Sequence, residues 1–367
     1  MNFDFSEEQK LLQKTTHDYL QEHSPLAVAR AVLESDASYS PELWKGAAEM
    51  GWLGVTIPEE HGGAGYGHLE LALIAQEIGA VLAPIPFSSS VYLATEALLL
   101  AGSPEQQARL LPRLASGDAI GTFALAEGAG RVSEQTLGTR LSAGALEGTK
   151  LPVPDGDIAD FAVVVARDGE GACLALVELD ARGVEVTRVD SIDPSRSQAR
   201  LELRGAQAER LESADQTGWS LVSHLLDRAA VLAAFEQLGG ALRAFDITRE
   251  FTLNRYAFGR PIASFQALKH RLADCYVELE LARSNGYYGA WALASGSDEL
   301  PLAACAARAS ACDAFELSTR EMIQMHGGVG YTWEYDCHLF YRRAKLLSVA
   351  LGSADHWREL LMQRLEN

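Results

Sequence analysis

The chain has 367 residues, of which 48% are apolar, and its 50 acidic and 31 basic side chains give a net charge of −19 at pH 7. This length supplies a core for two or three domains, or for one large one. The negative charge repels nucleic acid and anionic membrane surfaces, so neither is expected as a partner and action on a small molecule is favoured.

Residues 1–117 have the features of an N-terminal helical domain. Four helix starts are predicted from capping serines, prolines of a first turn and the apolar period: Ser6 with Gln9, Ser40-Pro41, a start near His68, and Ser103-Pro104. The opening MNFDFSEEQKLL lacks the basic and apolar regions of a signal peptide, and the sequence contains no apolar run of membrane-spanning length. A cytoplasmic protein is therefore expected.

Residues 118–213 change to short runs of β-favouring residues separated by Gly, Asp and Pro. The runs are AIGTFALAE, DFAVVVAR, ACLALVEL, GVEVTRV and QARLELRG. Runs of this length and spacing are typical of a small antiparallel sandwich or barrel. We therefore predict an α+β chain in which a middle β domain follows the helical one.

Residues 214–367 return to the helical period and are rich in alanine and leucine. The predicted helices of this C-terminal bundle are 216–249, 263–295, 299–326, 334–349 and 353–365. The five cysteines of the chain are scattered, without CxxC or a Cys/His cluster at zinc spacing. They are interpreted as reduced core residues, and no metal is predicted.

The stretch MHGGVGYTWE, residues 325–334, predicts two helices joined by a tight bend. Gly327, Gly328 and Gly330 permit left-handed or crowded backbone, so that another surface can come close. Thr332 is the predicted cap of the following helix. A plain helix corner would have the same pattern, so the bend alone does not indicate a function.

The stretch RYAFGRPIASFQ, residues 255–266, is more informative. A helix reaches Arg255, breaks at Gly259-Arg260-Pro261 and resumes before Gln266. The guanidinium of Arg255 is a rigid fork suited to a diphosphate, and the amide of Gln266 can read a nucleotide edge or ribose. Together with Gln324 and the glycine bend, these groups could clamp a phosphorylated cofactor.

Four segments make the whole chain resemble the acyl-CoA dehydrogenase family of flavoproteins. They are GWLGVTIPEEHGGAGYG at 51–67, GTK at 148–150, RYAFGRPIASFQ at 255–266 and QMHGGVGYTWE at 324–334. The resemblance implies a helical N-terminal domain, a middle β domain, a C-terminal four-helix bundle, and an FAD bound mainly by the neighbouring subunit. Its diphosphate and adenosine would be held by Arg255, Phe258, Gln266, Gln324, Gly327 and Gly328.

The resemblance also implies α,β-desaturation of an acyl-CoA thioester. A carboxylate in a dry pocket removes the α-proton while a hydride leaves the β-carbon for the flavin. The two positions that carry this base in family members fall on Leu351 and Ala229, which cannot accept a proton. Glu236 is the remaining candidate base, and Asp227 matches an acidic position near the thioester and is a candidate for substrate binding.

The middle domain departs from the family where it would line the flavin ring. Ala126, Pro152 and Pro154 stand at positions that usually carry groups in contact with the flavin. The part of the site that serves a neighbour's FAD is retained, and the part that a subunit uses for its own flavin ring is weakened.

Three hypotheses follow. The favoured one is that the chain is a subunit of a hetero-oligomer, two copies of each of two related chains, and completes the partner's FAD site. The second is an active homo-oligomeric dehydrogenase whose base has moved to Glu236. The third is an acyl-CoA-binding or scaffold protein without catalysis. For an enzyme, the resemblance suggests lipid or steroid degradation, as in β-oxidation, and electron-transfer flavoprotein as electron acceptor.

Overall fold

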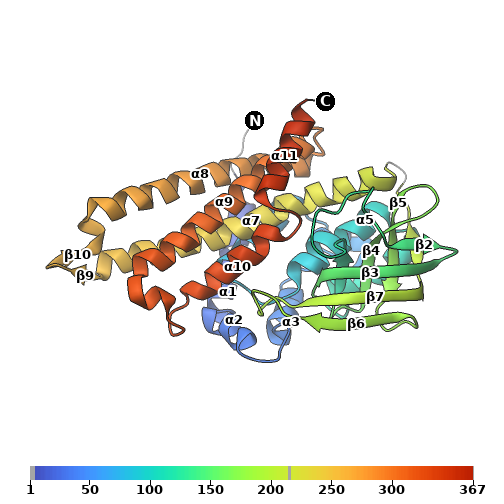
Figure 1. Cartoon of the computed structure of the whole chain (residues 1–367), viewed down its shortest axis with the longest axis horizontal. Helices are drawn as coiled ribbons and strands as arrows, with labels where there is room; N and C mark the ends of the chain where they lie inside the picture. Colours follow the sequence, from blue (N-terminus) through green and yellow to red (C-terminus); the bar gives the residue numbers. More distant parts are fainter. Residues whose placement is uncertain (1–4, 214–215, 367) are drawn as a thin grey trace. The chain divides into compact units, whose positions relative to one another are not determined.

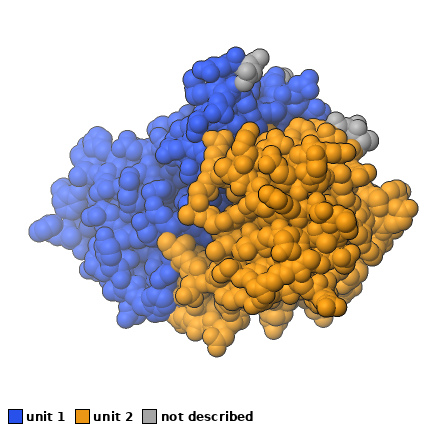
Figure 2. All heavy atoms as spheres, turned by 45° about the vertical axis from the view of Figure 1, so that its right-hand side comes forward, with its two compact units in different colours: residues 1–31, 68–83, 230–367 blue, residues 32–67, 84–229 orange. Residues whose placement is uncertain are grey.

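The computed structural model describes residues 5–213 and 216–366. The chain forms two compact units, each assembled from separate stretches of sequence (Figure 2). The helical unit consists of Met1–Ala31, His68–Ala83 and Ala230–Asn367, and the sheet unit of Val32–Gly67 and Pro84–Ala229. The division into three domains at 1–117, 118–213 and 214–367 stays a prediction, and residue 214 lies outside the described residues.

Most helices begin where local sequence predicts (Figure 1). Ser6 forms a capping box, in which its backbone N–H donates to Gln9 Oε1 at 2.9 Å and its hydroxyl accepts from the Gln9 N–H at 3.2 Å. The helices are α1 Glu7–His23, α2 Leu26–Leu33, α3 Pro41–Glu49, α4 His68–Ala80, α5 Glu96–Ala101, α6 Pro104–Ala115, α7 Gly218–Asn254, α8 Gln266–Ser295, α9 Leu300–His326, α10 Cys337–Val349 and α11 Ala354–Leu365.

The start of α10 differs from the prediction. The helix begins at Cys337, with Asp336 as its N-cap, and not near residue 334. Thr332 instead ends the short 3-10 helix η4, Gly327–Tyr331, and its hydroxyl donates to the Val329 carbonyl at 2.9 Å. Because this hydroxyl closes the preceding turn, it does not cap the next helix.

Helices α4 and α7 of the helical unit cross with their backbones in contact. A Cβ built on Gly79 would lie 1.8 Å from the Glu236 carbonyl oxygen, and one built on Gly239 would lie 1.8 Å from the Gln76 carbonyl oxygen. Only glycine fits at either position, since a backbone atom cannot swing away as a side chain can. The crossing fixes the part of α7 that carries Glu236 and Gln237.

The sheet unit contains one eight-stranded sheet. Its strands are β1 Gly121–Ala124, β2 Arg140–Ser142, β3 Ala145–Pro154, β4 Phe161–Arg167, β5 Ala172–Glu178, β6 Val184–Val189, β7 Gln198–Gln207 and β8 Glu209–Leu211. They pair in the order β6-β7-β3-β2-β4-β5-β8, and β1 pairs with β4. The sheet is not closed into a barrel, and β1 and β2 both run parallel to β4, whereas the predicted sheet was wholly antiparallel.

Strand β3 was missing from the predicted runs although it is ten residues long. Its sequence, ALEGTKLPVP, contains a lysine and two prolines and looks like a loop. In the structure it pairs with β7, with a register shift between Lys150 and Val153. Pro152, which lies in that interval, has no N–H to give to the ladder.

Three further findings bear on function. Among the described residues no helix is long and apolar enough to cross a membrane, and no group of His, Cys, Asp or Glu could hold a metal ion. All five cysteines are buried, and none of them forms a disulfide with a described residue. Burial raises the pKa of Cys275 to about 12 and those of Cys173 and Cys337 to about 11.

Candidate functional site

The residues predicted to hold a nucleotide come from one end of the helical unit, where α7 and α9 finish and α8 begins (Figure 1). Phe251 of α7 stacks on His326 of α9, with ring centroids 4.0 Å apart. Arg271 of α8 forms an ion pair with Glu321 of α9 at 2.6 Å. These two contacts hold the three helix ends together.

A two-stranded hairpin connects α7 to α8. The Arg255 N–H donates to the Phe251 carbonyl at 2.8 Å, and the Arg255 carbonyl accepts from the Ile262 N–H at 2.8 Å. The two strands of the hairpin, β9 Tyr256–Ala257 and β10 Arg260–Pro261, lie in the sequence between Arg255 and Ile262. The hairpin therefore leaves the end of α7 and returns to it, which fixes the backbone of Arg255.

The hairpin turn holds Phe258 out into solvent. Phe258 and Gly259 have φ values of 53° and 79°, the pattern of a type I′ turn, and Phe258 is 95% exposed. A bulky residue with positive φ is strained, and such strain is concentrated at functional sites. Arg260 folds back with its guanidinium carbon 4.1 Å from the centroid of the Phe265 ring.

The glycine bend combines three different backbone situations. Gly327 ends α9 with φ 61° and ψ −136°, and its N–H donates to the Gln324 carbonyl. Gly330 is crowded, because a Cβ there would lie 2.5 Å from the Ile323 carbonyl oxygen. Gly328 has nothing within 4 Å of such a Cβ. The space beside Gly328 is therefore open for an atom from outside the chain.

The end of the helical unit that carries the hairpin and the glycine bend, here called the hairpin end, is positively charged although the chain is acidic. Residues 251–273 contain Arg255, Arg260, Lys269 and Arg271 and no Asp or Glu. Arg271 is engaged by Glu321, whereas the exposed Arg255 side chain makes no ion pair or hydrogen bond with any described residue. An exposed guanidinium fork, at the end of the unit that also carries Gln266, Gln324 and the open Gly328, fits the anionic diphosphate of a nucleotide.

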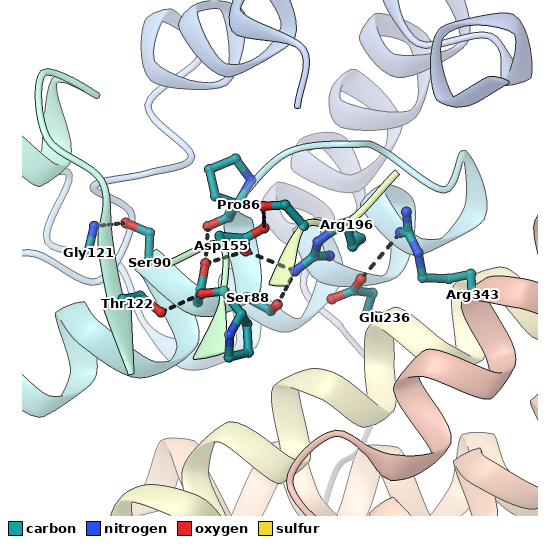
Figure 3. Close-up of polar contacts among 12 residues, drawn as sticks. Pro86, Ser88, Ser90, Gly121, Thr122, Asp155, Arg196, Glu236 and Arg343 are labelled. Atoms are coloured by element: carbon teal, nitrogen blue, oxygen red, sulfur yellow. Dashed lines mark hydrogen bonds and ion pairs between the residues drawn. The ribbon is translucent and has the colours of Figure 1, made fainter. Parts of the chain in front are cut away.

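Glu236, the candidate base, is buried on α7 with 1% of its surface exposed. Arg343 of α10 is equally buried, and its Nη1 lies 3.8 Å from Glu236 Oε1 (Figure 3). Arg343 also donates to the Leu82 carbonyl at 3.3 Å. This buried guanidinium ties α10 to α7 through Glu236, whereas a general base must lie within hydrogen-bond reach of the proton that it takes. The geometry thus favours a structural ion pair.

A second buried arginine holds the turn that contains Leu351. Arg308 of α9 is fully buried and donates to Gln237 on α7 and to the carbonyls of Leu347 and Ala350, the last at 2.6 Å. Leu351 follows with φ 60°. The guanidinium thus stabilises the carbonyl end of α10, where the helix dipole is negative.

The other two candidate positions lie in the sheet unit, where α7 begins. Asp227 is 3% exposed and Ala229 is fully buried. Arg228 between them forms a two-pronged ion pair with Glu96, with Nε and Nη2 at 2.8 and 2.7 Å from Glu96 Oε2. The segment is rigidly held, and the proposed substrate role of Asp227 stays a prediction.

Sequence analysis missed a buried polar cluster in the sheet unit. Asp155 follows β3 with φ 54°, accepts a 2.6 Å hydrogen bond from the Ser89 hydroxyl and lies 3.6 Å from Arg196 (Figure 3). Arg196 also donates to the Ser88 hydroxyl. Both serines belong to the π-helix η2, Ser88–Thr95. Helices of this kind are rare in proteins, and those that occur are often found at functional sites. The run of three serines in an apolar stretch was the available signal.

The buried Lys150 and the half-buried Glu127, which follows Ala126 in the sequence, form another ion pair. Lys150 Nζ donates to Glu127 Oε1 at 2.7 Å, and Glu127 also accepts from the N–H groups of Gly138 and Thr139. Burial raises the pKa of Glu127, but its hydrogen bonds outweigh this and lower it to about 2. Burial lowers the pKa of Lys150 to about 8 against the pull of Glu127. Both groups are therefore charged at pH 7.

This pair predicts a pH-dependent loss of stability. Glu127→Gln should lower the free energy of unfolding by about 1–3 kcal/mol at pH 7, because it removes a charge-assisted partner of Lys150. The folded pKa of Glu127 lies below its ordinary value of 4.5, so its contribution is complete above about pH 4.5 and is lost as the pH falls toward 2. In urea titrations, the free energies of unfolding of the parent and the Glu127→Gln variant should therefore converge over this pH range. A difference that stays constant with pH would contradict the assignment.

Known proteins resemble this chain over most of its length. Residues 6–118 match the model of the acyl-CoA dehydrogenase N-terminal domain, and residues 216–366 match that of the C-terminal domain. The chain is 36% identical over 363 residues to acyl-CoA dehydrogenase IpdE2 of Mycobacterium tuberculosis, covering 98% of this chain and 97% of that protein.

Solved structures of two-chain assemblies are also similar. A chain of the ChsE4-ChsE5 complex of Mycobacterium tuberculosis has a TM-score of 0.92 and 29% identity, covering 100% of this chain and 99% of that chain. A chain of the Tcur3481-Tcur3483 steroid ACAD has a TM-score of 0.89 and 30% identity, covering 98% of each. This chain therefore belongs to the acyl-CoA dehydrogenase family of oxidoreductases.

Proposed function

We propose that the chain is one subunit of a hetero-oligomeric, FAD-dependent acyl-CoA dehydrogenase, in which it completes the FAD site of a second family chain. The observation that carries this proposal is a contrast between two sites. The hairpin end keeps the exposed guanidinium of Arg255, which has no partner among the described residues. In contrast, Leu351 and Ala229 provide no carboxylate, and Glu236 is held by Arg343. One half of a flavin site is thus present without its base.

Each residue of the hairpin end has a role in this proposal. The Arg255 fork takes the diphosphate, and Gln266 and Gln324 offer amides to the adenosine. Phe258 presents an apolar face to it. Gly327 and Gly328 let the nucleotide approach the backbone, since no Cβ stands in its way. The donors fit the nucleotide part of FAD, and Ala126, Pro152 and Pro154 leave its ring to the partner.

Desaturation requires a carboxylate that takes the α-proton of the acyl-CoA thioester and an acceptor for the β-hydride. When bound, FAD supplies that acceptor. In this proposal the base belongs to the partner, and the present chain contributes binding energy and an interface that excludes water. We propose a bulky acyl-CoA as substrate, electron-transfer flavoprotein as electron acceptor, a tetramer with two copies of each chain, and a cytoplasmic location.

Two alternatives remain testable. An active homo-oligomer with Glu236 as its base is favoured by one observation: Glu236 Oε1 and Arg343 Nη1 are 3.8 Å apart, which is longer than a hydrogen bond between these two atoms. A scaffold that binds acyl-CoA without flavin would need no exposed Arg255. Flavin content separates all three.

The test compares the chain expressed alone with the complex purified from its native host through a tag on this chain. We expect the chain alone to be nearly colourless, and the complex to contain a second family chain and one FAD per pair of chains, measured by absorbance at 450 nm. Binding of FAD across the interface would also stabilise the complex by linkage. A homotetramer with one FAD per chain and steady turnover would overturn the proposal.

A substitution assigns the effect to the hairpin end. Arg255→Lys keeps the charge but loses the second donor arm, so the complex should retain FAD about tenfold less tightly while its thermal unfolding without FAD is unchanged. Arg243→Lys, on the exposed surface of α7, is the control and should leave FAD binding as it is. Equal FAD affinity of both variants would remove Arg255 from the site.

A further inference from the structure

An open cleft of about 270 Å³ lies in the helical unit, lined by side chains of α2, α7 and α9 and by the residues at the start of α10. Its walls are largely apolar or aromatic, with Phe251 of α7, Met322 of α9 and Tyr335 among them. The six residues proposed to hold FAD do not line it. A concave apolar surface with a few polar groups is the usual form of a small-molecule site, and this volume suits a compact molecule.

His326 supplies a hydrogen-bond acceptor in the wall of this cleft. The side chain is 6% exposed, and its Nδ1 lies 2.7 Å from the Met322 carbonyl oxygen. A carbonyl can only accept, so Nδ1 carries the proton and Nε2 is the acceptor. Burial lowers the pKa of His326 below its ordinary value of 6.5, so the ring is neutral at pH 7. Nε2 makes no hydrogen bond with a described residue, and a donor from outside the chain would satisfy it.

The imidazole is held in one orientation by its neighbours. Phe251 stacks on it with ring centroids 4.0 Å apart, and Tyr335 packs edge-on with its centroid 6.2 Å away. The segment that carries Tyr335 is fixed in turn, because Arg30 of α2 donates to the Trp333 carbonyl at 2.7 Å and pairs with Asp336 at 2.6 Å. The acceptor and two aromatic walls are therefore in place before a ligand arrives, which favours binding.

The rim of the cleft adds further acceptors and a negative charge. Glu250 is exposed on α7 and forms no ion pair with a described residue. Asn254 donates its side-chain N–H to the Glu250 carbonyl at 3.1 Å, which leaves its Oδ1 as an acceptor. Asp336 also lines the cleft, but its charge is matched by Arg30. An imidazole nitrogen, an amide oxygen and a carboxylate thus line one cleft, and all three accept hydrogen bonds.

We propose that this cleft binds a small organic cation, a flat amidinium or guanidinium group on an apolar body. Its N–H donors satisfy His326 Nε2 and the rim acceptors, and its charge matches Glu250. Its flat face packs against Phe251 and Tyr335, as cationic groups do on aromatic rings. An anion is repelled by Glu250, and a purely apolar molecule leaves Nε2 without a donor. A site of this kind needs neither FAD nor a second chain, and it goes beyond the proposed function.

Isothermal titration calorimetry of the full chain with benzamidine tests the chemistry of the site. Benzamidine carries a flat amidinium on an aromatic ring, benzamide has nearly the same shape but is neutral, and benzoate is an anion. We expect a single saturable site for benzamidine, with an affinity about tenfold or more above that for benzamide, and no measurable binding of benzoate. Equal affinities for benzamidine and benzamide, or no saturable binding of benzamidine, would overturn the proposal.

Two substitutions assign the binding to the cleft. Glu250→Gln removes the charge at an exposed position, so benzamidine should bind about fivefold more weakly and benzamide as before. His326→Phe keeps a ring against Phe251 but removes Nε2, so both probes should bind about tenfold more weakly. Glu22→Gln, at an exposed position of α1, is the matched control and should change neither affinity. Circular dichroism identifies the variants that fold, and unchanged benzamidine affinity in a folded Glu250→Gln or His326→Phe variant would overturn the proposal.

The same titration of the assembly purified from its native host identifies the source of the cation. A basic side chain of another protein has the same chemistry as a free ligand, but it would fill the cleft in the assembly. A free ligand requires the cleft to stay open there, so benzamidine should bind the assembly and the isolated chain with equal affinity. Binding to the isolated chain alone would assign the cleft to a side chain of another protein and overturn the proposal of a free ligand.

Discussion

Arg343→Met should lower the free energy of unfolding by about 3–5 kcal/mol, because the Glu236 carboxylate would be left in the core without its cation. Both side chains are 1% exposed, so water cannot take the place of the guanidinium. The double variant Arg343→Met with Glu236→Leu should recover most of this loss, since a buried pair can be replaced by apolar side chains at little cost. Urea unfolding followed by circular dichroism measures all three proteins.

The same pair decides whether Glu236 is a base. Glu236→Gln keeps the size of the side chain but cannot take a proton, so a structural Glu236 predicts turnover of the complex within tenfold of the parent. Acyl-CoA-dependent reduction of an artificial electron acceptor measures this. A loss of a hundredfold or more, with FAD content and stability unchanged, would make Glu236 the base and favour the homo-oligomeric enzyme.

Gly239→Ala should cost about 3 kcal/mol or more, or prevent folding altogether. The new Cβ would lie 1.8 Å from the Gln76 carbonyl oxygen, so α4 and α7 would have to separate and lose their packing. Gly286→Ala is a matched control in α8, where the nearest atom is an ordinary 3.5 Å away in the Phe235 ring. It should be neutral or stabilise by up to about 1 kcal/mol, since alanine favours helix over glycine.

Melting temperatures of the two alanine variants give the answer directly. Gly239→Ala should melt well below the parent and Gly286→Ala at or above it. If both melt together, the close crossing does not hold this region of α7. The result also bears on Glu236, whose backbone carbonyl is the atom that Gly79 accommodates.

Features set by neighbouring residues were predictable from sequence, and features set by distant ones were not. The Ser6–Gln9 capping box and the proline starts of α3 and α6 depend on contacts within one turn, and the predictions are confirmed. The predicted start of α10 was wrong because the Thr332 hydroxyl closes the preceding turn, and the N-cap is Asp336, four residues further along.

The candidate site shows the same division. Arg255 and Gln266 were singled out by a local signal, a helix that breaks at Gly259-Arg260-Pro261 and resumes before Gln266, and their role stays a prediction. Arg343 and Arg308 were not foreseen as partners of Glu236 and Gln237, since those contacts join different helices. Strand β3 escaped because its long-range partner β7 outweighs the poor β propensity of its prolines.

The burial of all five cysteines offers a way to watch assembly as it happens. Thiolate is the form that reacts with maleimides, and burial both hides these sulfurs and keeps three of them protonated well above neutral pH. A sixth thiol introduced by Ser284→Cys, at an exposed position of α8, would be the one that takes a fluorescent dye rapidly. Such a label needs no cysteine-free background, so the arrival of a partner could be timed on an otherwise unaltered chain.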